Sequence, residues 1–270
     1  MEIAFAKCSP TQNVTILVES AVPRPEQPAV AASLLAYDSV GGEQVGFLET
    51  AALPGARLRL QMMGGEFCGN ATMSAGAYLA WHEHLPDGGR ADYPLEVSGS
   101  EGLTVCRIER IGDAFRGTVR MPLPRRIDTV SLETDTGVLT LPMIEMPGIT
   151  HVVAPMEMLS REEIARRIRA WNQILRADAL GLLRYDEDEG SIEPLVYVPA
   201  TDSAVWERGC GSGTAALGGW LAQRAGQAIC RTIRQPGGEI EVRAEIETGR
   251  ISCLSITGTV RMTARGTAWI

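Results

Sequence analysis

The chain has 270 residues, of which 45% are hydrophobic and 21% are charged. This length and composition are typical of a globular protein with one large or two ordinary domains, and no apolar run is long enough to span a membrane. The formal net charge is -8, which argues against nucleic acid as the main partner because phosphate binding favours a basic face. The N-terminal segment lacks the basic-then-apolar pattern of a secretion signal, so we expect a cytoplasmic protein.

Short apolar runs predict several strands in the first half of the chain. The predicted strands cover 14–18, 57–63, 103–109 and 117–121. A helix is predicted after Gly69, because Met73, Ala77 and Trp81 recur every four residues.

Two prolines and two arginines within 121–128 predict a turn or linker that separates two halves, 1–125 and 126–270. In the second half, strands are predicted at 151–155, 195–199, 239–246 and 251–262. Ser160 and Glu163 have the spacing of a capping box, so a helix is expected to begin directly after Ser160.

The two halves repeat one another. At an offset of 142 residues, Cys68 and Gly69 fall on Cys210 and Gly211, and four further identities follow within the next eleven positions. The segment GTVRM at 117–121 recurs at 258–262, an offset of 141. Two matches at nearly the same offset indicate an internal repeat. We therefore predict an α+β fold of two pseudo-symmetric domains.

Each repeat places a Cys–Gly pair directly before a predicted helix. The N–H groups and dipole at a helix N-terminus lower the pKa of a nearby thiol, and the same N–H groups bind a carboxylate. Gly69 permits close approach of a ligand to the backbone, and Asn70 is the expected cap of the first helix. Gly211, Ser212 and Gly213 repeat this arrangement after Cys210.

A free cysteine in a globular protein is most often a small buried apolar residue. Of the six cysteines, only two lie in the repeated Cys–Gly context. We interpret Cys8, Cys106, Cys230 and Cys253 as apolar residues of this kind. The repetition instead favours a functional interpretation for Cys68 and Cys210.

Two such thiols suit one reaction in particular. A thiolate on one side of a bound amino acid would remove its α-proton, and a thiol on the other side would return one. Helix N–H groups would stabilise the charge that develops on the carboxylate. This chemistry inverts a stereocentre with no cofactor and no metal. The single lysine, Lys7, lies in a strand-like segment at the N-terminus, an unpromising place for a Schiff base, which argues against pyridoxal phosphate.

With these residues the sequence resembles the diaminopimelate-epimerase-like superfamily of cofactor-independent amino-acid racemases, over nearly the whole chain. The motifs are KCSPTQNVTILV, GGEQVGFLE, GITHVV and WERGCGSGT. The resemblance implies two domains, each with a mixed, mostly antiparallel sheet wrapped around a central helix, and an active site in the cleft between them. It implies Cys68 and Cys210 as the catalytic acid and base. The residues expected to bind the substrate are Asn13, Glu43, Gln44, Gly69, Asn70, Glu207, Arg208, Gly211, Ser212 and Gly213.

Within the superfamily, the sequence is more similar to the histidine racemase of staphylopine-type metallophore biosynthesis. The shared segments are EQVGF, EFCGNATMS, CGSGTA and QPGG. Gly209 joins Glu207–Arg208 directly to Cys210, which argues against diaminopimelate, and Asn70 after the first Cys–Gly argues against proline. Histidine is therefore the leading substrate.

Other interpretations stay open. Arg208 matches the diaminopimelate epimerases, where it contacts a distal carboxylate, so diaminopimelate or another polar amino acid is the alternative substrate. A non-catalytic protein of the same fold would bind a small carboxylate, and a redox dithiol protein would work through a disulfide of the two motif cysteines. We expect a small-molecule amino acid as substrate, neither nucleic acid nor membrane as a partner, and a homodimer as the assembly.

Overall fold

The structure is a computed structural model that describes residues 1–270. The chain folds into two compact units. Unit 1 comprises Met1–Arg120 and Thr257–Ile270, and unit 2 comprises Met121–Ile256. The chain leaves unit 1 where the prolines and arginines of 121–128 predict a linker.

Unit 1 is a ring of strands around one helix. Its strands are β1 (Glu2–Pro10), β2 (Thr15–Val18), β3 (Gln44–Glu49), β4 (Arg59–Met62), β5 (Arg90–Val97), β6 (Leu103–Ile111), β7 (Ala114–Arg120) and the later part of β16 (Arg250–Trp269). They lie in chain order, and β16 pairs with β1 to close the ring. The β2–β3 and β4–β5 pairs are parallel, whereas β1–β2, β3–β4, β5–β6 and β6–β7 are antiparallel.

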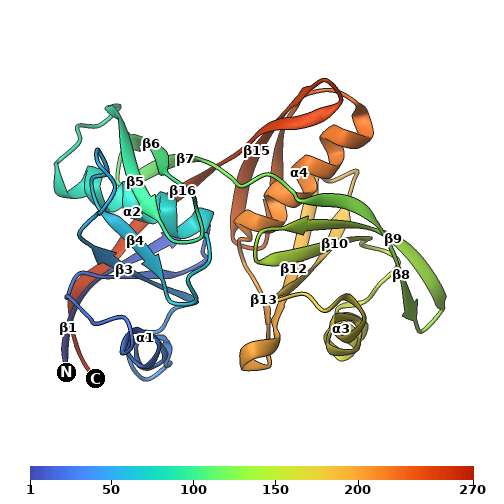
Figure 1. Cartoon of the computed structure of the whole chain (residues 1–270), viewed down its shortest axis with the longest axis horizontal. Coiled ribbons are helices and arrows are strands. Elements are labelled where there is room, and N and C mark those ends of the chain that lie inside the picture. The colour runs from blue at the N-terminus through green and yellow to red at the C-terminus, as the bar shows by residue number, and fades with distance from the viewer. The chain divides into compact units, whose positions relative to one another are not determined.

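Two helices accompany these strands, and they differ in what surrounds them. Helix α2 (Gly69–His82) contacts β1, β2 and β4–β7, and ten of its fourteen residues are buried. Helix α1 (Gln27–Leu35) packs against β3, where Val30 and Leu34 join an apolar cluster with Phe47. Figure 1 shows α2 among the strands of unit 1. The regular spacing of Met73 and Ala77 thus marks a helix that is buried on most sides.

Unit 2 repeats this plan. Its strands are β8 (Arg126–Thr134), β9 (Gly137–Met146), β10 (Ile149–Pro155), β11 (Leu180–Asp186), β12 (Ser191–Val198), β13 (Ser203–Trp206), β14 (Ile229–Gln235), β15 (Gly238–Glu247) and the beginning of β16. Their order is β16-β15-β14-β12-β11-β10-β9-β8, with β13 paired to β12. The β10–β11 and β12–β14 pairs are parallel.

Helix α4 (Gly211–Ala225) is the counterpart of α2. It contacts β9, β10, β14 and β15, and ten of its fifteen residues are buried. Figure 1 shows α4 beside β15. Helix α3 (Arg161–Leu175) lies against β11 and β12 through Ile164, Ile168 and Trp171. The hydroxyl of Ser160 accepts the N–H of Glu163 at 3.1 Å, which confirms the predicted helix start. A short 3-10 helix, η1 (Pro199–Thr201), precedes β13.

The architecture confirms the predicted α+β class, with a mixed, mostly antiparallel sheet around a central helix in each unit. The units and the expected halves differ in one respect. Residues 257–270 belong to unit 1 rather than to the second half, because β16 pairs in antiparallel register with β1 from Glu2–Trp269 to Pro10–Val260. No helix of the structure combines the length and apolar character needed to span a membrane.

Candidate active site

Cys68 is the N-cap of helix α2. Its backbone is extended, so its Sγ lies over the first turn and accepts the N–H of Ala71 at 3.4 Å. The hydroxyl of Thr72 donates to the carbonyl oxygen of Cys68 at 2.7 Å. The expectation that Asn70 caps this helix is therefore wrong, because the thiol occupies the capping position and Asn70 is inside the first turn.

A chain of polar contacts extends from Cys68 through three of the residues predicted to bind substrate. The Cys68 thiol donates to Oε1 of Gln44 at 2.7 Å. The amide of Gln44 donates in turn to Oδ1 of Asn13, and Nδ2 of Asn13 donates to Glu43 at 3.0 Å. Asn13 is buried, whereas Glu43, Gln44 and Cys68 are partly exposed. The structure thus gathers four predicted residues from three separate segments of unit 1.

Cys210 caps helix α4 in the same way. Its Sγ accepts the N–H of Gly213 at 3.3 Å, and the hydroxyl of Thr214 donates to its carbonyl oxygen at 2.7 Å. Gly211 and Gly213 are buried in the first turn. The two cysteine caps therefore share one hydrogen-bonding scheme, as the sequence repeat predicts.

Burial dominates the electrostatics of Cys210. Desolvation raises the pKa of its thiol well above 9.0, and the charge of Glu207 and a hydrogen bond with that carboxylate raise it further. Hydrogen bonds from Ser212 and from the Gly213 N–H act in the opposite direction. The expectation of a lowered pKa is wrong for this cysteine, because the loss of hydration outweighs the helix N-terminus.

Arg208 is exposed, and its guanidinium donates to the carbonyl oxygen of Pro236 at 3.1 Å. Pro236 lies in the QPGG segment, which begins at the last residue of β14. The same segment contributes Gln235, whose Oε1 accepts the backbone N–H of Cys210 at 2.6 Å. Sequence reasoning missed Gln235 as a site residue, although it noted the motif.

His151 is a second residue that sequence reasoning missed. It is fully buried on β10, and its Nε2 lies 3.1 Å from the hydroxyl of Ser212. That hydroxyl lies 3.5 Å from Sγ of Cys210. The other ring nitrogen, Nδ1, is buried with no hydrogen-bond partner, and a Cβ at residue 181, which is Gly181, would lie 2.1 Å from it. The only signal in the sequence was the GITHVV segment.

The family profile described as "Histidine racemase CntK N-terminal domain" matches residues 2–269. The chain belongs to this family. It is 33% identical to the histidine racemase of Staphylococcus aureus, over 99% of this chain and 98% of that protein. It is 28% identical to the histidine racemase of Fusobacterium nucleatum, over 98% and 97% of the two chains. Membership places the chain among racemases, which are isomerases.

Solved structures that resemble this member of the histidine racemase CntK family share its fold at low identity. A hydroxyproline epimerase from Agrobacterium vitis matches with a TM-score of 0.71 and 12% identity, over 98% of this chain and 92% of that one. A PhzF-family phenazine biosynthesis protein from Bacillus anthracis matches with a TM-score of 0.71 and 14% identity, over 100% of both chains. These structural neighbours show that the chain has the fold that the hydroxyproline epimerase and the PhzF-family protein share.

In this family member, the remaining cysteines differ in exposure. Burial raises the pKa of Cys8 to about 12 and also raises that of Cys106. Both fit the interpretation as small apolar residues, and Cys253 is partly exposed. The same interpretation is wrong for Cys230, which is exposed on β14.

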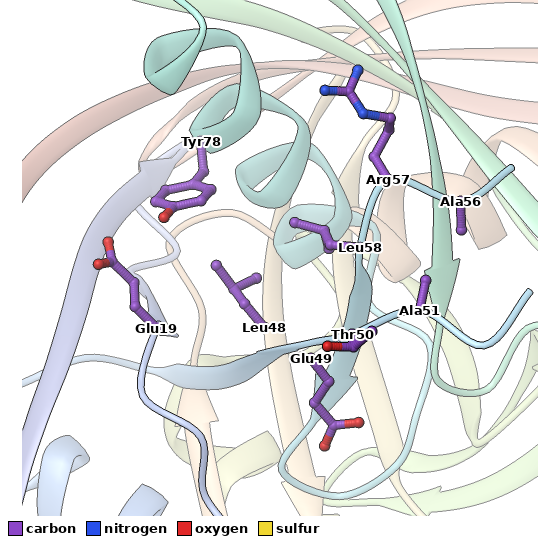
Figure 2. A pocket seen from close by; sticks show the side chains of 9 residues that line it. All are labelled: Glu19, Leu48, Glu49, Thr50, Ala51, Ala56, Arg57, Leu58 and Tyr78. Carbon is purple, nitrogen blue, oxygen red and sulfur yellow. The ribbon is translucent and has the colours of Figure 1, made fainter.

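Unit 1 of this histidine racemase family member also has a surface hollow of about 460 Å³ beside α2 and β3. Figure 2 shows Glu19, Glu49, Arg57 and Tyr78 around it. None of the predicted site residues lines this hollow. Its charged side chains already form ion pairs, Glu19 with Arg265, Glu49 with Arg24 and Arg57 with Glu83. The hollow is therefore a poor candidate for the site that binds an amino acid.

The buried His151 gives this member of the histidine racemase CntK family a measurable pH dependence. Desolvation lowers its pKa from 6.5 to about 3, so the native state stays neutral where the unfolded chain binds a proton. The stabilisation is complete above pH 6.5 and is lost as the pH falls towards 3. At pH 5 this residue alone should lower the free energy of unfolding by about 2 kcal/mol relative to pH 7.5.

Urea unfolding of wild type and His151→Gln at pH 7.5 and pH 5 measures this contribution. The variant should lose about 2 kcal/mol less stability between the two pH values. His84→Gln is the matched control, because it makes the same change at an exposed histidine. Equal losses in wild type and His151→Gln would contradict the prediction.

Proposed function

We propose that this chain interconverts L- and D-histidine by cofactor-independent, two-base racemisation at Cα, with Cys68 and Cys210 as the acid and base. The observation that carries the proposal is the shared geometry of the two cysteines. Each caps a central helix, each Sγ accepts a first-turn N–H, and each carbonyl oxygen accepts a threonine hydroxyl. Membership of the histidine racemase family supports the choice of substrate.

In the proposed reaction the two cysteines act on opposite faces of the same α-carbon. One thiolate removes the α-proton, so that the Cα–H bond breaks and an S–H bond forms. The other thiol then gives its proton to the opposite face, and its S–H bond becomes the new Cα–H bond. The total number of protons is unchanged, and the two cysteines exchange their protonation states. Each turnover therefore leaves the enzyme ready for the reverse direction.

The hydrogen-bond partners of the two thiols support this scheme. The thiol of Cys68 donates to the neutral amide of Gln44, which accepts a hydrogen bond without taking the proton. The thiol of Cys210 is hydrogen-bonded to the carboxylate of Glu207, and this contact favours the protonated thiol. We assign Glu207 as the group that keeps Cys210 protonated as the acid, in addition to its expected contact with the α-ammonium group. Substrate binding that excludes water would strengthen both contacts.

The α-carboxylate of histidine is assigned to the first turns of α2 and α4. Helix N-termini carry unsatisfied N–H donors and a positive dipole end, which favour an anion. The residues proposed to line this position are Gly69, Asn70, Gly211, Ser212 and Gly213. Asn13 and Gln44 hold the Cys68 side of the site, and Glu43 is assigned to the imidazole. Its partner Asn13 keeps the Glu43 carboxylate oriented at 3.0 Å.

Incubation with a panel of L-amino acids in D₂O, with the thiols kept reduced, tests the proposal. L-Histidine should exchange its α-hydrogen for deuterium, seen by proton NMR, and should lose optical rotation. Turnover of diaminopimelate or another amino acid instead would overturn the substrate assignment. Binding of histidine without any exchange would overturn catalysis and favour the carboxylate-binding alternative.

The wider setting is part of the same proposal. The D-histidine product would supply metallophore biosynthesis, which is supported by resemblance to the staphylopine-type pathway enzyme. A cytoplasmic location is supported by the chemistry, because two free thiols must stay reduced. Racemisation rates of reduced and oxidised samples distinguish the racemase from a redox dithiol protein. In the racemase, a Cys68–Cys210 disulfide should abolish racemisation. A homodimer stays a prediction that light scattering would check.

A further inference from the structure

The QPGG segment links β14 to β15 and lies against the residues on both sides of Cys210. Gln235 ends β14 and Gly238 begins β15, where the two residues pair across the turn. Gln235 is 9% exposed. The proposed chemistry assigns no role to this turn.

The side-chain amide of Gln235 closes a ring of hydrogen bonds around the backbone of Cys210. Its Oε1 accepts the Cys210 N–H at 2.6 Å, and its Nε2 donates to Oγ1 of Thr214 at 2.7 Å. That same hydroxyl donates to the carbonyl oxygen of Cys210 at 2.7 Å. Because the Thr214 hydroxyl donates its one proton to the carbonyl oxygen, it can only accept from Gln235, so the amide of Gln235 must direct its NH₂ group at Thr214. Both ends of the amide are therefore committed.

The turn also holds the neighbouring Arg208 by two contacts. The backbone N–H of Gly237 donates to the carbonyl oxygen of Arg208 at 2.7 Å. The guanidinium of Arg208 donates to the carbonyl oxygen of Pro236 at 3.1 Å. One short turn thus fixes the main chain before and at the proposed catalytic cysteine, together with an arginine expected to contact substrate.

Helix capping alone does not require this arrangement. In unit 1, Thr72 makes the same bond to Cys68 that Thr214 makes to Cys210. In unit 1 the strand that follows the central helix, β5, ends at Val97, and the hydroxyl of the next residue, Ser98, donates to the carbonyl oxygen of Glu66 at 2.8 Å, two residues before Cys68. Neither Val97 nor Ser98 is a glutamine, so the glutamine ring belongs to unit 2, whereas the threonine cap is shared by both units.

We infer that Gln235 is a positioning residue of the racemase site, which fixes Sγ of Cys210 through its main chain, and that Pro236 aims the guanidinium of Arg208. This inference rests on the proposed function. Proton transfer requires a precise distance between donor and acceptor, and a displacement of about 1 Å can cost about 10²-fold in rate. A residue that holds the cysteine backbone at two points acts on that distance without touching the substrate.

The test uses Gln235→Met, which keeps an unbranched side chain of similar length and removes both polar ends. With histidine as substrate, kcat should fall about 10- to 100-fold while KM changes by less than about threefold. Thr214→Val should act on the same ring, so the double variant should be little slower than Gln235→Met. If the two rate losses multiplied in the double variant, Gln235 and Thr214 would act independently, and the claim that they act through one ring would be wrong.

Isotope effects separate positioning from a merely structural role. L- and D-histidine deuterated at Cα should show a raised isotope effect on kcat in Gln235→Met for one enantiomer, the one whose proton Cys210 removes. Thr72→Val is the matched variant in unit 1, and it should raise the isotope effect for the opposite enantiomer. Equal changes for both enantiomers, or a rate loss that follows only the folded fraction, would overturn the inference. A wild-type chain that fails to exchange histidine would instead overturn the proposed function itself.

Discussion

Replacing Cys210 by serine is expected to reduce histidine racemisation by about 10²–10⁴-fold, the contribution of a positioned acid or base. A serine hydroxyl keeps the size and hydrogen bonding of the thiol but is a far weaker acid. Cys68→Ser should have the same effect, because each turnover uses both groups. The measurement is decay of optical rotation from L-histidine, with thermal unfolding to verify that each variant is folded.

Cys230→Ser is the matched control for these variants, because Cys230 is the exposed free cysteine on β14. Its activity should stay within about twofold of wild type, as for most surface substitutions. If Cys68→Ser or Cys210→Ser kept more than a tenth of the wild-type rate, the two-thiol mechanism would be wrong.

The two single-serine variants should also differ in which enantiomer they recognise. The thiol that remains can still remove a proton from the face it contacts. In D₂O, each variant should therefore exchange the α-hydrogen of only one enantiomer without inverting it, and the two variants should choose opposite enantiomers. Exchange of the same enantiomer by both variants would place the two cysteines on one face and exclude the proposed geometry.

Gly218→Ala is expected to destabilise unit 2, although alanine favours a helix by about 1 kcal/mol over glycine. A Cβ at this position of α4 would lie 2.4 Å from Cγ2 of Val242, which is fully buried on β15. Neither the helix backbone nor a buried β-branched side chain can move far, and overpacking of this kind typically costs 1–3 kcal/mol or more. We expect a net loss of about 2 kcal/mol and a thermal midpoint lower by about 5 °C.

Gly219→Ala provides the control on the same helix. There a Cβ would lie 3.2 Å from Cδ1 of Ile251 and 3.4 Å from Cγ of Pro124, and Ile251 is only partly buried. The gain in helix propensity should balance this milder contact, so the midpoint should change little. A Gly218→Ala protein at least as stable as Gly219→Ala would show that α4 does not approach β15 as closely as the structure indicates.

The repeat in the sequence marks this same close approach in unit 1. Gly76 of α2 falls on Gly218 at the offset of 142 residues, and a Cβ there would lie 2.7 Å from Sγ of Cys106. The identity of these glycines therefore has a packing cause, because a central helix must approach its sheet at the distance that only glycine permits. Cys106 is part of that packing rather than of the site.

The sequence by itself determined the features that depend on neighbours along the chain. Ser160 and Glu163 are three residues apart, and their capping hydrogen bond forms within one turn. Apolar residues predicted strands at 14–18 and 103–109, because the fully buried β2 needs a continuous apolar run and the half-buried β6 needs an alternating one, wherever they pair. The offset repeat also paired Cys68 with Cys210, since two copies of one fold retain similar local sequence around each helix start.

Only the tertiary structure decided the contacts that join distant segments. Gln235 reaches a cysteine 25 residues away, and His151 meets Ser212 across 61 residues, because strand register brings β14 and β10 beside α4. Burial likewise separated Cys8 from the exposed Cys230, although local sequence treats them alike. The pairing of β16 with β1 returned the C-terminal residues to unit 1. Sequence patterns encode period and spacing, whereas these outcomes depend on which strands lie side by side, and that is fixed by the whole sheet.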